Sequence, residues 1–361
     1  MVTGEEFRDP ELAGSVLARI GEELQEPLHF MEVCGTHTVA IFQSGLRSLL
    51  PEALRHISGP GCPVCVTHPE EIAAALLLAR RPGVMTVTFG DMMRVPGPDG
   101  SSLKTAQTEG ARTSICYSPF EALRIASENP QLEVVLLAVG FETTAAAVAA
   151  TVQRAREEGV GNFSVLSCHK RIPPALRHLL QSGEVGVDGF LLPGHVSTII
   201  GLGPYRFLAE ELGQPAVVTG FEPLDILQGL LMLARMRKAG APRVANQYAR
   251  AVNEEGNRTA RRVMDAVFRT VTAKWRGLGP IGQSGLDLAP EFADFDARRR
   301  FDLEVEPAQE PRGCSCGEVL QGKLRPDGCP LFGRACSPAS PVGPCMVSTE
   351  GSCAAYFKYA T

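Results

Sequence analysis

Cysteine is the residue type whose number and spacing in this sequence point most clearly to chemistry. The chain holds 11 cysteines, and six of them fall between Cys314 and Cys353. Two others form the loop Cys62-Pro-Val-Cys65, and Cys34 stands alone at the end of an apolar run. Because thiols in a reducing compartment seldom form structural disulfides, this usage indicates metal binding or redox chemistry.

The three front cysteines, Cys34, Cys62 and Cys65, are expected to form one thiolate site that holds a metal. A Cys-x-x-Cys loop lets two thiolates reach one ion with little chain strain, and Gly59 and Gly61 free its backbone to curl. With three thiolate ligands, an iron or zinc ion would keep one coordination position open, as metal ions in reactive sites do. The alternative is a redox pair of Cys62 and Cys65 alone, with Cys34 an ordinary buried thiol.

The tail predicts a second sulfur site of a different kind. It is rich in glycine and proline and has little apolar core of its own, so an inorganic centre is needed to order it. Four thiolates hold a [4Fe–4S] cluster, whereas structural zinc prefers tight Cys-x₂₋₄-Cys pairs. The wide spacings favour a cluster, and they do not decide which four of the six cysteines bind it. The six are Cys314, Cys316, Cys329, Cys336, Cys345 and Cys353.

The segments between these cysteines alternate between β-like and helical patterns, which predicts an α/β fold with parallel sheets covered by helices on both faces. Strands are expected at residues 28–33, 84–89, 134–139, 163–167, 189–192 and 216–219. Helices are expected at residues 69–80, 142–158, 174–181 and 224–238.

Two smaller sheets are favoured over one large sheet, which gives two similar parallel-sheet α/β domains and a third domain. The first covers residues 28–115 and carries the front cysteines, and the second covers residues 116–240. The third joins residues 1–27 to residues 241–361 and is expected to be helical, with the iron–sulfur tail at its end. Its best candidate helix spans residues 249–269, and the polar stretch 304–313 is expected to be a linker into the tail.

Polar or glycine-rich motifs follow almost every predicted strand, including Cys168-His-Lys170 and Pro193-Gly-His195. Ligands of open α/β sheets bind beyond the carboxyl ends of the strands, so we expect a shared functional face there. His37 lies one helical turn from Cys34. It could be a fourth metal ligand or an acid–base group.

Composition limits the function further. The 361 residues carry 35 Lys and Arg against 40 Asp and Glu, a formal net charge of −5, which argues against a general nucleic-acid binder. We expect no membrane span, because the apolar runs are short, and no secretory signal, because the first residues are acidic and polar. A cytoplasmic protein is expected.

Several motifs together resemble those of the HypD family of hydrogenase maturation proteins. The cysteine-rich tail resembles that family's cluster region, and the likeness covers nearly the whole chain in the family's order. The motifs are Cys34-Gly-Thr-His-Thr38, Gly59-Pro-Gly-Cys-Pro-Val-Cys65, Gly140-Phe-Glu-Thr-Thr144, Leu192-Pro-Gly-His195 and Gly220-Phe-Glu-Pro-Leu-Asp225.

The resemblance implies a role in assembling the Fe(CN)2CO unit of [NiFe] hydrogenases. It implies a complex with a small HypC-type chaperone that holds the iron, and acceptance of cyanide from a HypE-type carrier. By the same resemblance the three front cysteines correspond to the family's iron-binding and functional cysteines. The tail cysteines that match the family's cluster spacing are Cys314, Cys329, Cys336 and Cys353.

In such a role His37, Glu142 and His195 could protonate or position ligands of the iron. The alternatives are structural: a carboxylate in the first turn of a helix is favoured by the helix dipole, and His195 could be a hydrogen-bonded structural histidine. Two other functions stay open. One is a disulfide reductase that acts through Cys62 and Cys65 with a cluster feeding it, and the other is a scaffold whose tail binds zinc.

Overall fold

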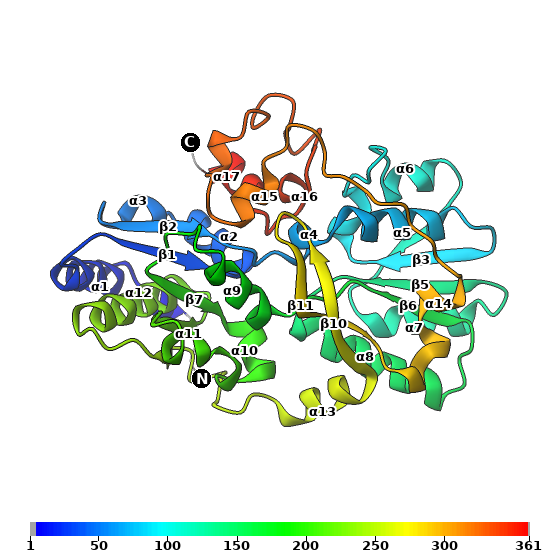
Figure 1. Ribbon diagram of the computed structural model, residues 1–361, viewed down its shortest axis with the longest axis horizontal. Helices are drawn as coiled ribbons and strands as arrows, with labels where there is room; N and C mark the ends of the chain where they lie inside the picture. Colours follow the sequence, from blue (N-terminus) through cyan, green and yellow to red (C-terminus); the bar gives the residue numbers. More distant parts are fainter. Residues whose placement is uncertain (1–4, 360–361) are drawn as a thin grey trace.

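The computed structural model describes residues 5–359, and it contains two parallel β-sheets side by side (Figure 1). Residues 1–4 and 360–361, which belong to the expected third domain, lie outside the described residues. The first sheet has the strand order β2-β1-β7-β8-β9. Its strands are β1 (Leu28–Glu32), β2 (Leu54–Ser58), β7 (Gly189–Pro193), β8 (Ala216–Thr219) and β9 (Val244–Asn246).

The second sheet has the strand order β4-β3-β5-β6, and all of its neighbours are parallel. Strands β6, β7 and β8 are buried along their whole length, which explains why they read as continuous apolar runs. The strands of this sheet are β3 (Val84–Thr88), β4 (Arg112–Ile115), β5 (Glu133–Ala138) and β6 (Phe163–Ser167).

The two sheets confirm the expected α/β class, but the strands do not divide at residue 115 as we expected. Strands β1 and β2 pair with β7, β8 and β9, whereas β3 to β6 form the other sheet. The chain therefore leaves the first sheet after Ser58 and returns at Gly189. The stretch at residues 107–118, which includes the expected boundary at residue 115, contains β4 and belongs to the second sheet. Sequence order misled here because strand pairing is not confined to neighbours along the chain.

Helices cover both sheets and join them. Helix α12 packs against β7 and β8 beside α1, and α7 and α8 pack against β5. Between the sheets, α8 contacts α10, and a shared apolar core includes Val33, Leu137 and Leu192. The helices before the hairpin are α1 (Pro10–Glu23), α2 (Gly35–Gln43), α3 (Leu46–Leu49), α4 (Pro63–Val66), α5 (Pro69–Ala79), α6 (Leu103–Thr108), α7 (Pro119–Glu128), α8 (Glu142–Glu157), α9 (Ile172–Gln181), α10 (Gly194–Ile200), α11 (Phe207–Glu210), α12 (Pro223–Lys238) and α13 (Arg258–Val267).

The segment after residue 240 is less helical than we expected. It holds an antiparallel hairpin of β10 (Phe268–Trp275) and β11 (Gly279–Leu288), and the expected helix is reduced to α13. The β-branched run Thr270-Val-Thr272 favours a strand. Gly256, at a φ of 67°, lies just before α13 in a conformation that a helix interior does not allow. Figure 1 shows the hairpin between the two sheets.

The cysteine-rich tail lies against the first sheet's side of the molecule, where α17 contacts α2 (Figure 1). The linker at residues 304–313 has no helix or strand, as predicted. Short helices separated by turns make up the tail: α15 (Cys316–Leu320), η5 (Pro326–Gly328), α16 (Pro344–Val347) and α17 (Ser352–Tyr359). The remaining short elements are η1 (Glu5–Arg8), η2 (Gly90–Arg94), η3 (Gly203–Tyr205), η4 (Pro290–Phe295) and α14 (Ala297–Arg300).

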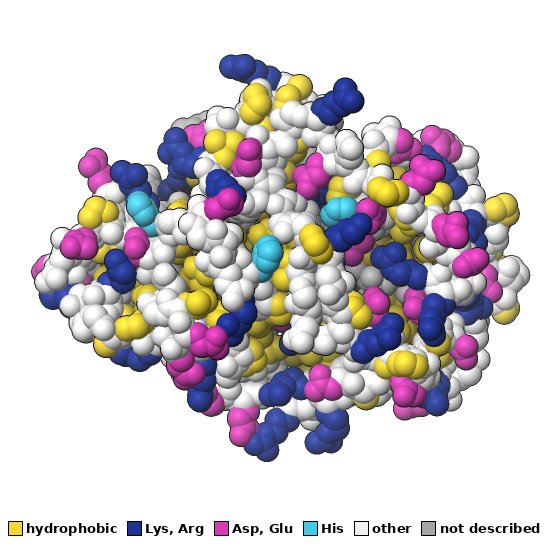
Figure 2. All heavy atoms as spheres, in the orientation of Figure 1, with side chains coloured by type: hydrophobic (Ala, Val, Ile, Leu, Met, Phe, Trp, Pro, Cys, Tyr) yellow, Lys and Arg dark blue, Asp and Glu magenta, His cyan; other side chains and the backbone are white. Residues whose placement is uncertain are grey.

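The surface carries both signs of charge. Lys and Arg side chains alternate with Asp and Glu over the face shown in Figure 2. Among residues 5–359, no helix combines the length and the apolar composition needed to cross a membrane.

Candidate functional site

Cys34 and the Cys62 loop meet at the carboxyl ends of β1 and β2. Cys34 is the N-cap of α2, and the next amide, that of Gly35, donates a hydrogen bond of 3.0 Å to the carbonyl of Gly61. A Cβ atom on Gly61 would lie only 2.0 Å from the amide nitrogen of Cys34. Glycine is therefore required here for the two segments to approach each other. The structure thus brings the predicted front cysteines together.

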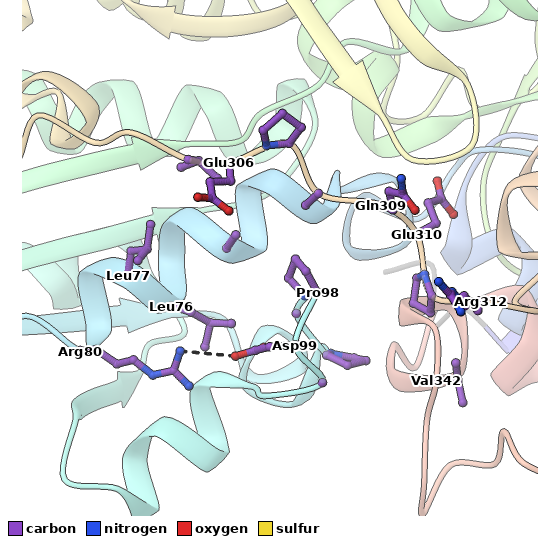
Figure 3. Close-up of a pocket in the computed structure, with 18 of the residues that line it drawn as sticks. Leu76, Leu77, Arg80, Pro98, Asp99, Glu306, Gln309, Glu310, Arg312 and Val342 are labelled. Atoms are coloured by element: carbon purple, nitrogen blue, oxygen red, sulfur yellow. Dashed lines mark ion pairs between the residues drawn. The ribbon is translucent and has the colours of Figure 1, made fainter.

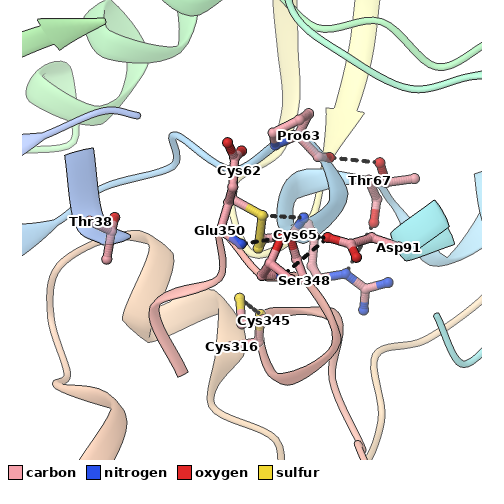
Figure 4. Close-up of a disulfide and its surroundings, with 12 residues drawn as sticks. Thr38, Cys62, Pro63, Cys65, Thr67, Asp91, Cys316, Cys345, Ser348 and Glu350 are labelled. Carbon is pink, nitrogen blue, oxygen red and sulfur yellow. Dashed lines mark hydrogen bonds between the residues drawn. A yellow bond between two sulfur atoms is a disulfide. The ribbon is translucent and has the colours of Figure 1, made fainter. Parts of the chain in front are cut away.

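The chemical state of the front cysteines differs from the open thiolate trio that we expected. Cys62 and Cys65 form a disulfide across the first turn of α4, with their Cα atoms 5.2 Å apart (Figure 4). Cys34 is a free thiol, 9% exposed. The described part of the chain contains no cluster of three or more His, Cys, Asp or Glu side chains arranged for a metal ion. Three thiolates are available at this site only after the disulfide is reduced.

Burial governs the chemistry of Cys34. Desolvation raises the pKa of its thiol to about 12, and the carboxylates of Glu350 and Glu32 add to the shift. Glu32 is fully buried and accepts a hydrogen bond of 2.9 Å from the amide of Cys34. Glu350 reaches the site from the tail and accepts a hydrogen bond of 2.8 Å from Thr36. At neutral pH the thiol is protonated, so a bound cation is needed to favour its thiolate.

His37 and His195 share one aromatic neighbour. The ring of Phe221 lies 4.7 Å from the ring of His37 and 4.1 Å from that of His195, centroid to centroid. His37 is fully buried, and its Nε2 lies 2.9 Å from the carbonyl of Gly220, so Nε2 carries the proton that it donates there. The Nδ1 atom has no hydrogen-bond partner. Burial lowers the pKa of His37, which keeps the ring neutral, with Nδ1 as an unpaired acceptor.

Glu142 comes from the second sheet, at the start of α8. It is buried, and its Oε1 accepts a hydrogen bond of 3.1 Å from the amide of Ile172. Burial raises its pKa to about 7, which suits a group that exchanges a proton near neutral pH. Sequence reasoning missed Tyr205, a fully buried residue whose pKa is raised by burial and by nearby Glu142. Tyr205 is distinguished only by its burial, and no sequence motif predicts that this residue is buried.

All six tail cysteines line one small cavity. The sulfur atoms of Cys316 and Cys345 lie 2.8 Å apart without being bonded. A Cβ atom on Gly343 would lie 2.7 Å from the sulfur of Cys314, so glycine keeps this wall of the cavity open. Hydrogen bonds from Cys314 and Cys345 lower the pKa of Cys316, and the same contacts raise the pKa of both partners.

The donor set of this cavity fits an iron–sulfur cluster. A single tetrahedral ion needs four sulfur atoms within about 4 Å of one another, whereas a cluster distributes its thiolates over several irons. The structure offers six thiols around one space, and iron–sulfur clusters are held by such ligands. Hydrogen bonds link Cys314 to Cys316, Cys316 to Cys345 and Cys345 to Cys353.

The tail and the disulfide loop are in direct contact. Helices α15 and α16, which carry Cys316 and Cys345, both contact α4, and Figure 4 shows this pair of cysteines beside the disulfide. The turn after α16 is fixed by Asp91, whose carboxylate accepts hydrogen bonds of 3.0 Å from the hydroxyl of Ser348 and the amide of Thr349. The two sulfur sites that the sequence predicted separately are therefore neighbours.

The hairpin tip helps to hold this contact. Arg276 is 1% exposed, and its Nε donates a hydrogen bond of 3.0 Å to the carbonyl of Thr67, directly after α4. A Cβ atom on Gly277 would lie 2.2 Å from the Cα of Gly317 in α15, so the two backbones touch. The tip therefore bridges the end of the disulfide loop and the start of the tail.

Two pockets lie near the disulfide loop and the tail, and only one of them is lined by a residue of the disulfide loop. A pocket of about 990 Å³ between α5 and the linker at 304–313 contains an Arg80–Asp99 ion pair and none of the predicted site residues (Figure 3). A second pocket, of about 580 Å³, is lined by Pro63 of the disulfide loop together with Asp91 and Glu350. It gives access from solvent to the side of the molecule that carries the disulfide.

The sequence is similar to one protein family and to several curated proteins over nearly its whole length. The family described as the Hydrogenase formation hypA family, HypD, matches residues 11–360. The chain belongs to the HypD family. It is 45% identical to the hydrogenase maturation factor HypD of Cupriavidus necator, over 98% of this chain and 96% of that protein. The HypD factor of Escherichia coli is 44% identical over 98% of this chain and 97% of its own length.

Membership of the HypD family makes the chain a hydrogenase maturation factor. The family's motifs quoted from the sequence, from Cys34 to Asp225, fall at the carboxyl ends of strands in both sheets. The front cysteines therefore lie among other family motifs rather than on an isolated loop.

Proposed function

We propose that this HypD-family protein is the scaffold on which the Fe(CN)2CO unit of [NiFe] hydrogenases is assembled. Cys34 binds the iron fragment together with a small HypC-type chaperone, and cyanide is delivered by a HypE-type carrier. The observation that carries the proposal is the direct contact of a free buried thiol, a disulfide loop and a cysteine-lined cavity. A cytoplasmic location belongs to the same proposal.

The front site has two states in this proposal. With the Cys62–Cys65 disulfide intact, Cys34 is the one free thiol of the front trio. Two electrons and two protons from an external reductant break the S–S bond and give two thiols. Reduction therefore turns one available sulfur ligand into three, and soft thiolates suit low-spin iron that carries cyanide and carbonyl. The disulfide acts as a control on when the site can hold iron.

Residues around the front site have distinct tasks. The bound cation stabilises the thiolate of Cys34, which burial otherwise keeps protonated. Neutral His37 offers Nδ1 as an acceptor, and Glu142, with a pKa of about 7, can take up or release a proton. His195 is exposed and stacks on Phe221, so it can meet a partner or an incoming ligand. These three residues position or protonate ligands of the iron.

The tail has a supporting role. We propose that Cys314, Cys329, Cys336 and Cys353 hold a [4Fe–4S] cluster, which would supply electrons one at a time. Cys316 and Cys345 stand between this cavity and α4. They are the thiols placed to exchange with the disulfide, since thiol–disulfide exchange requires direct approach of sulfur to sulfur.

Infrared spectroscopy of the complex with the HypC-type chaperone tests the assembly role. We expect bands from iron-bound cyanide and carbonyl in the native complex, and none when Cys34→Ser replaces the thiol. Serine is the most informative substitution, because its side chain is close in size to that of cysteine and only the soft sulfur ligand is lost. Native-strength bands in the Cys34→Ser complex would rule out iron binding at Cys34.

The disulfide itself favours a second candidate, a reductase that acts through Cys62 and Cys65 without binding iron. This candidate predicts that the protein reduces a disulfide substrate catalytically when given an electron donor, with Cys34→Ser fully active. The assembly role predicts the opposite dependence, because Cys34 is then essential. Comparing infrared bands and reductase turnover in the same variant separates the two functions.

A further inference from the structure

A polar pocket unrelated to the sulfur sites lies where the hairpin crosses the carboxyl end of β6. Its volume is about 370 Å³, within the range of small-ligand sites. The walls come from the start of α5, the residues after β6, both hairpin strands and α14. His169 and Lys170 of the sequence motif Cys168-His-Lys170, which the proposed function does not use, form part of one wall. We call this space the hairpin pocket.

Two of the charged pairs in the hairpin pocket are complete within the protein. Lys170 is 1% exposed and pairs with Glu71 at 2.6 Å. Lys274 of β10 pairs with Glu70 at 2.8 Å. These pairs join α5 to β6 and to the hairpin, so they fix the walls and leave no charge of their own for a ligand.

Two further charges face the same pocket without a direct contact to a charged partner. Arg298 of α14 and Asp287 of β11 both line it and lie close enough for each charge to shift the pKa of the other, but neither side chain makes a hydrogen bond or a direct ion pair within residues 5–359. Both are partly buried, and burial is the main cause that raises the pKa of Asp287. A partly buried charge without a direct hydrogen-bond partner is costly. Because this cation and this anion face one pocket without touching, a ligand that carries both signs can pair with each of them.

A third group in the wall lacks a partner as well. His169 is 1% exposed, and its Nδ1 lies 3.1 Å from the hydroxyl of Ser167. That hydroxyl already donates its hydrogen to the carbonyl of Leu286 at 2.6 Å, so Nδ1 of His169 must be the donor. Burial lowers the pKa of His169 to about 3, and the ring is neutral. Its Nε2 is left as a buried acceptor without a hydrogen-bond partner.

We propose that the hairpin pocket binds a small zwitterion of the amino-acid type. The carboxylate of the ligand pairs with Arg298, its ammonium group pairs with Asp287, and an N–H or O–H of the ligand satisfies Nε2 of His169. A simple anion would leave Asp287 unpaired, and a simple amine would leave Arg298 unpaired. A zwitterion carries two opposite charges, so it can pair with Arg298 and with Asp287 at the same time.

Calorimetric titration of the full-length protein tests this, with the proteinogenic L-amino acids as probes. The chain's single tryptophan, Trp275, lies in β10 and gives an independent fluorescence readout. We expect at least one amino acid to bind, and acetate and methylammonium, each of which carries one of the two charges, to bind about tenfold more weakly or not at all. No binding by any amino acid, or acetate equal to the best amino acid, would overturn the proposal.

Variants identify the charges that hold the ligand. Arg298→Gln and Asp287→Asn should each weaken binding about tenfold or more, because each removes one charge-assisted pair. Arg298→Lys keeps the charge and should retain part of the affinity. Arg299→Gln is the matched control, since this neighbour in α14 is exposed and does not line the pocket. Unchanged binding in Arg298→Gln, or equal loss in Arg299→Gln, would place the ligand elsewhere.

Discussion

The amide of Gly35 and the carbonyl of Gly61 are joined by a hydrogen bond of 3.0 Å, which ties the residue after Cys34 to the residue before Cys62. No side chain fits at Gly61, because its Cβ would lie 2.0 Å from the amide nitrogen of Cys34. The spacing between the free thiol and the disulfide therefore depends on backbone contact.

Gly61→Ala should separate the two front segments. We expect a loss of at least about 2 kcal/mol in the free energy of unfolding, as for other cases of overpacking, and loss of hydrogenase maturation. Denaturant unfolding and hydrogenase activity after co-expression measure both effects. Gly90→Ala is the matched control, because a Cβ there meets nothing within 4 Å. Equal stability of the two variants would contradict the backbone contact.

Cys34→Ala, Cys62→Ala and Cys65→Ala should each abolish maturation while the visible absorption of the tail centre stays intact. The reason is that the front thiols serve the iron cargo and the tail thiols serve the cluster. Cys116→Ala should be mild, since Cys116 follows β4 and stands apart from both sulfur sites. Full maturation in Cys62→Ala would show that the front cysteines do not act together.

Chemical analysis of the anaerobically purified protein checks the tail. We expect about four irons and four sulfides per chain, as a four-thiolate cluster requires. Alanine at Cys314, Cys329, Cys336 or Cys353 should remove the absorption. Cys345→Ala should keep it, because this residue contacts Cys316 and belongs to a helix that contacts α4. Zinc without acid-labile sulfide would contradict the cluster.

We expect the free energy of unfolding to fall as the pH rises, because of the buried carboxyl group of Glu142. Its pKa is about 7 in the folded protein against an ordinary value of 4.5, so the folded state binds the proton more tightly than the unfolded state. The protein therefore loses stability between about pH 4.5 and pH 7, by about 3 kcal/mol in total. Glu142→Gln should abolish this component when urea unfolding is compared at pH 5 and pH 8. An identical pH dependence in the variant would show that Glu142 is not the group involved.

Arg276 lies outside every cysteine motif of the sequence, but we expect it to stabilise the disulfide loop. Arg276→Met removes the hydrogen bond to Thr67 and leaves that carbonyl unpaired, at a cost of about 1–3 kcal/mol. We also expect faster hydrogen exchange in α4, measured by mass spectrometry. Arg269→Met, on an exposed position of the same hairpin, is the control. Unchanged exchange in α4 would mean that the tip does not hold the disulfide loop.

The local elements were predictable because their signals are local. The strands at 163–167 and 216–219 match the expected limits, and the expected helix at 69–80 ends one residue earlier. Sheet membership was not predictable from the same signals. Nothing within residues 28–33 specifies that β1 pairs with β7 rather than with β3, since pairing is decided by the packing of the whole domain.

The residues of the site were predictable from the sequence, but the contacts between the parts of the site were not. The motifs identified Cys34, Cys62 and Cys65 and the cysteine-rich tail. The contact between α4 and the tail helices joins segments about 250 to 280 residues apart in the sequence, and cysteine spacing along the chain does not predict contacts over such separations. The role of Arg276 and the raised pKa of Tyr205 both depend on burial, which single residues outside a motif do not reveal.

The pairing of β1 with β7 also constrains how the protein is made. On a ribosome β1 and β2 emerge first, and their partner strand begins only at Gly189. The whole second sheet is synthesised in between, so it can fold while the first sheet is still incomplete. Until β7 is synthesised, one edge of β1 has no partner strand, and unpaired strand edges promote aggregation. A nascent chain stalled before residue 189 should therefore bind chaperones through residues 28–58.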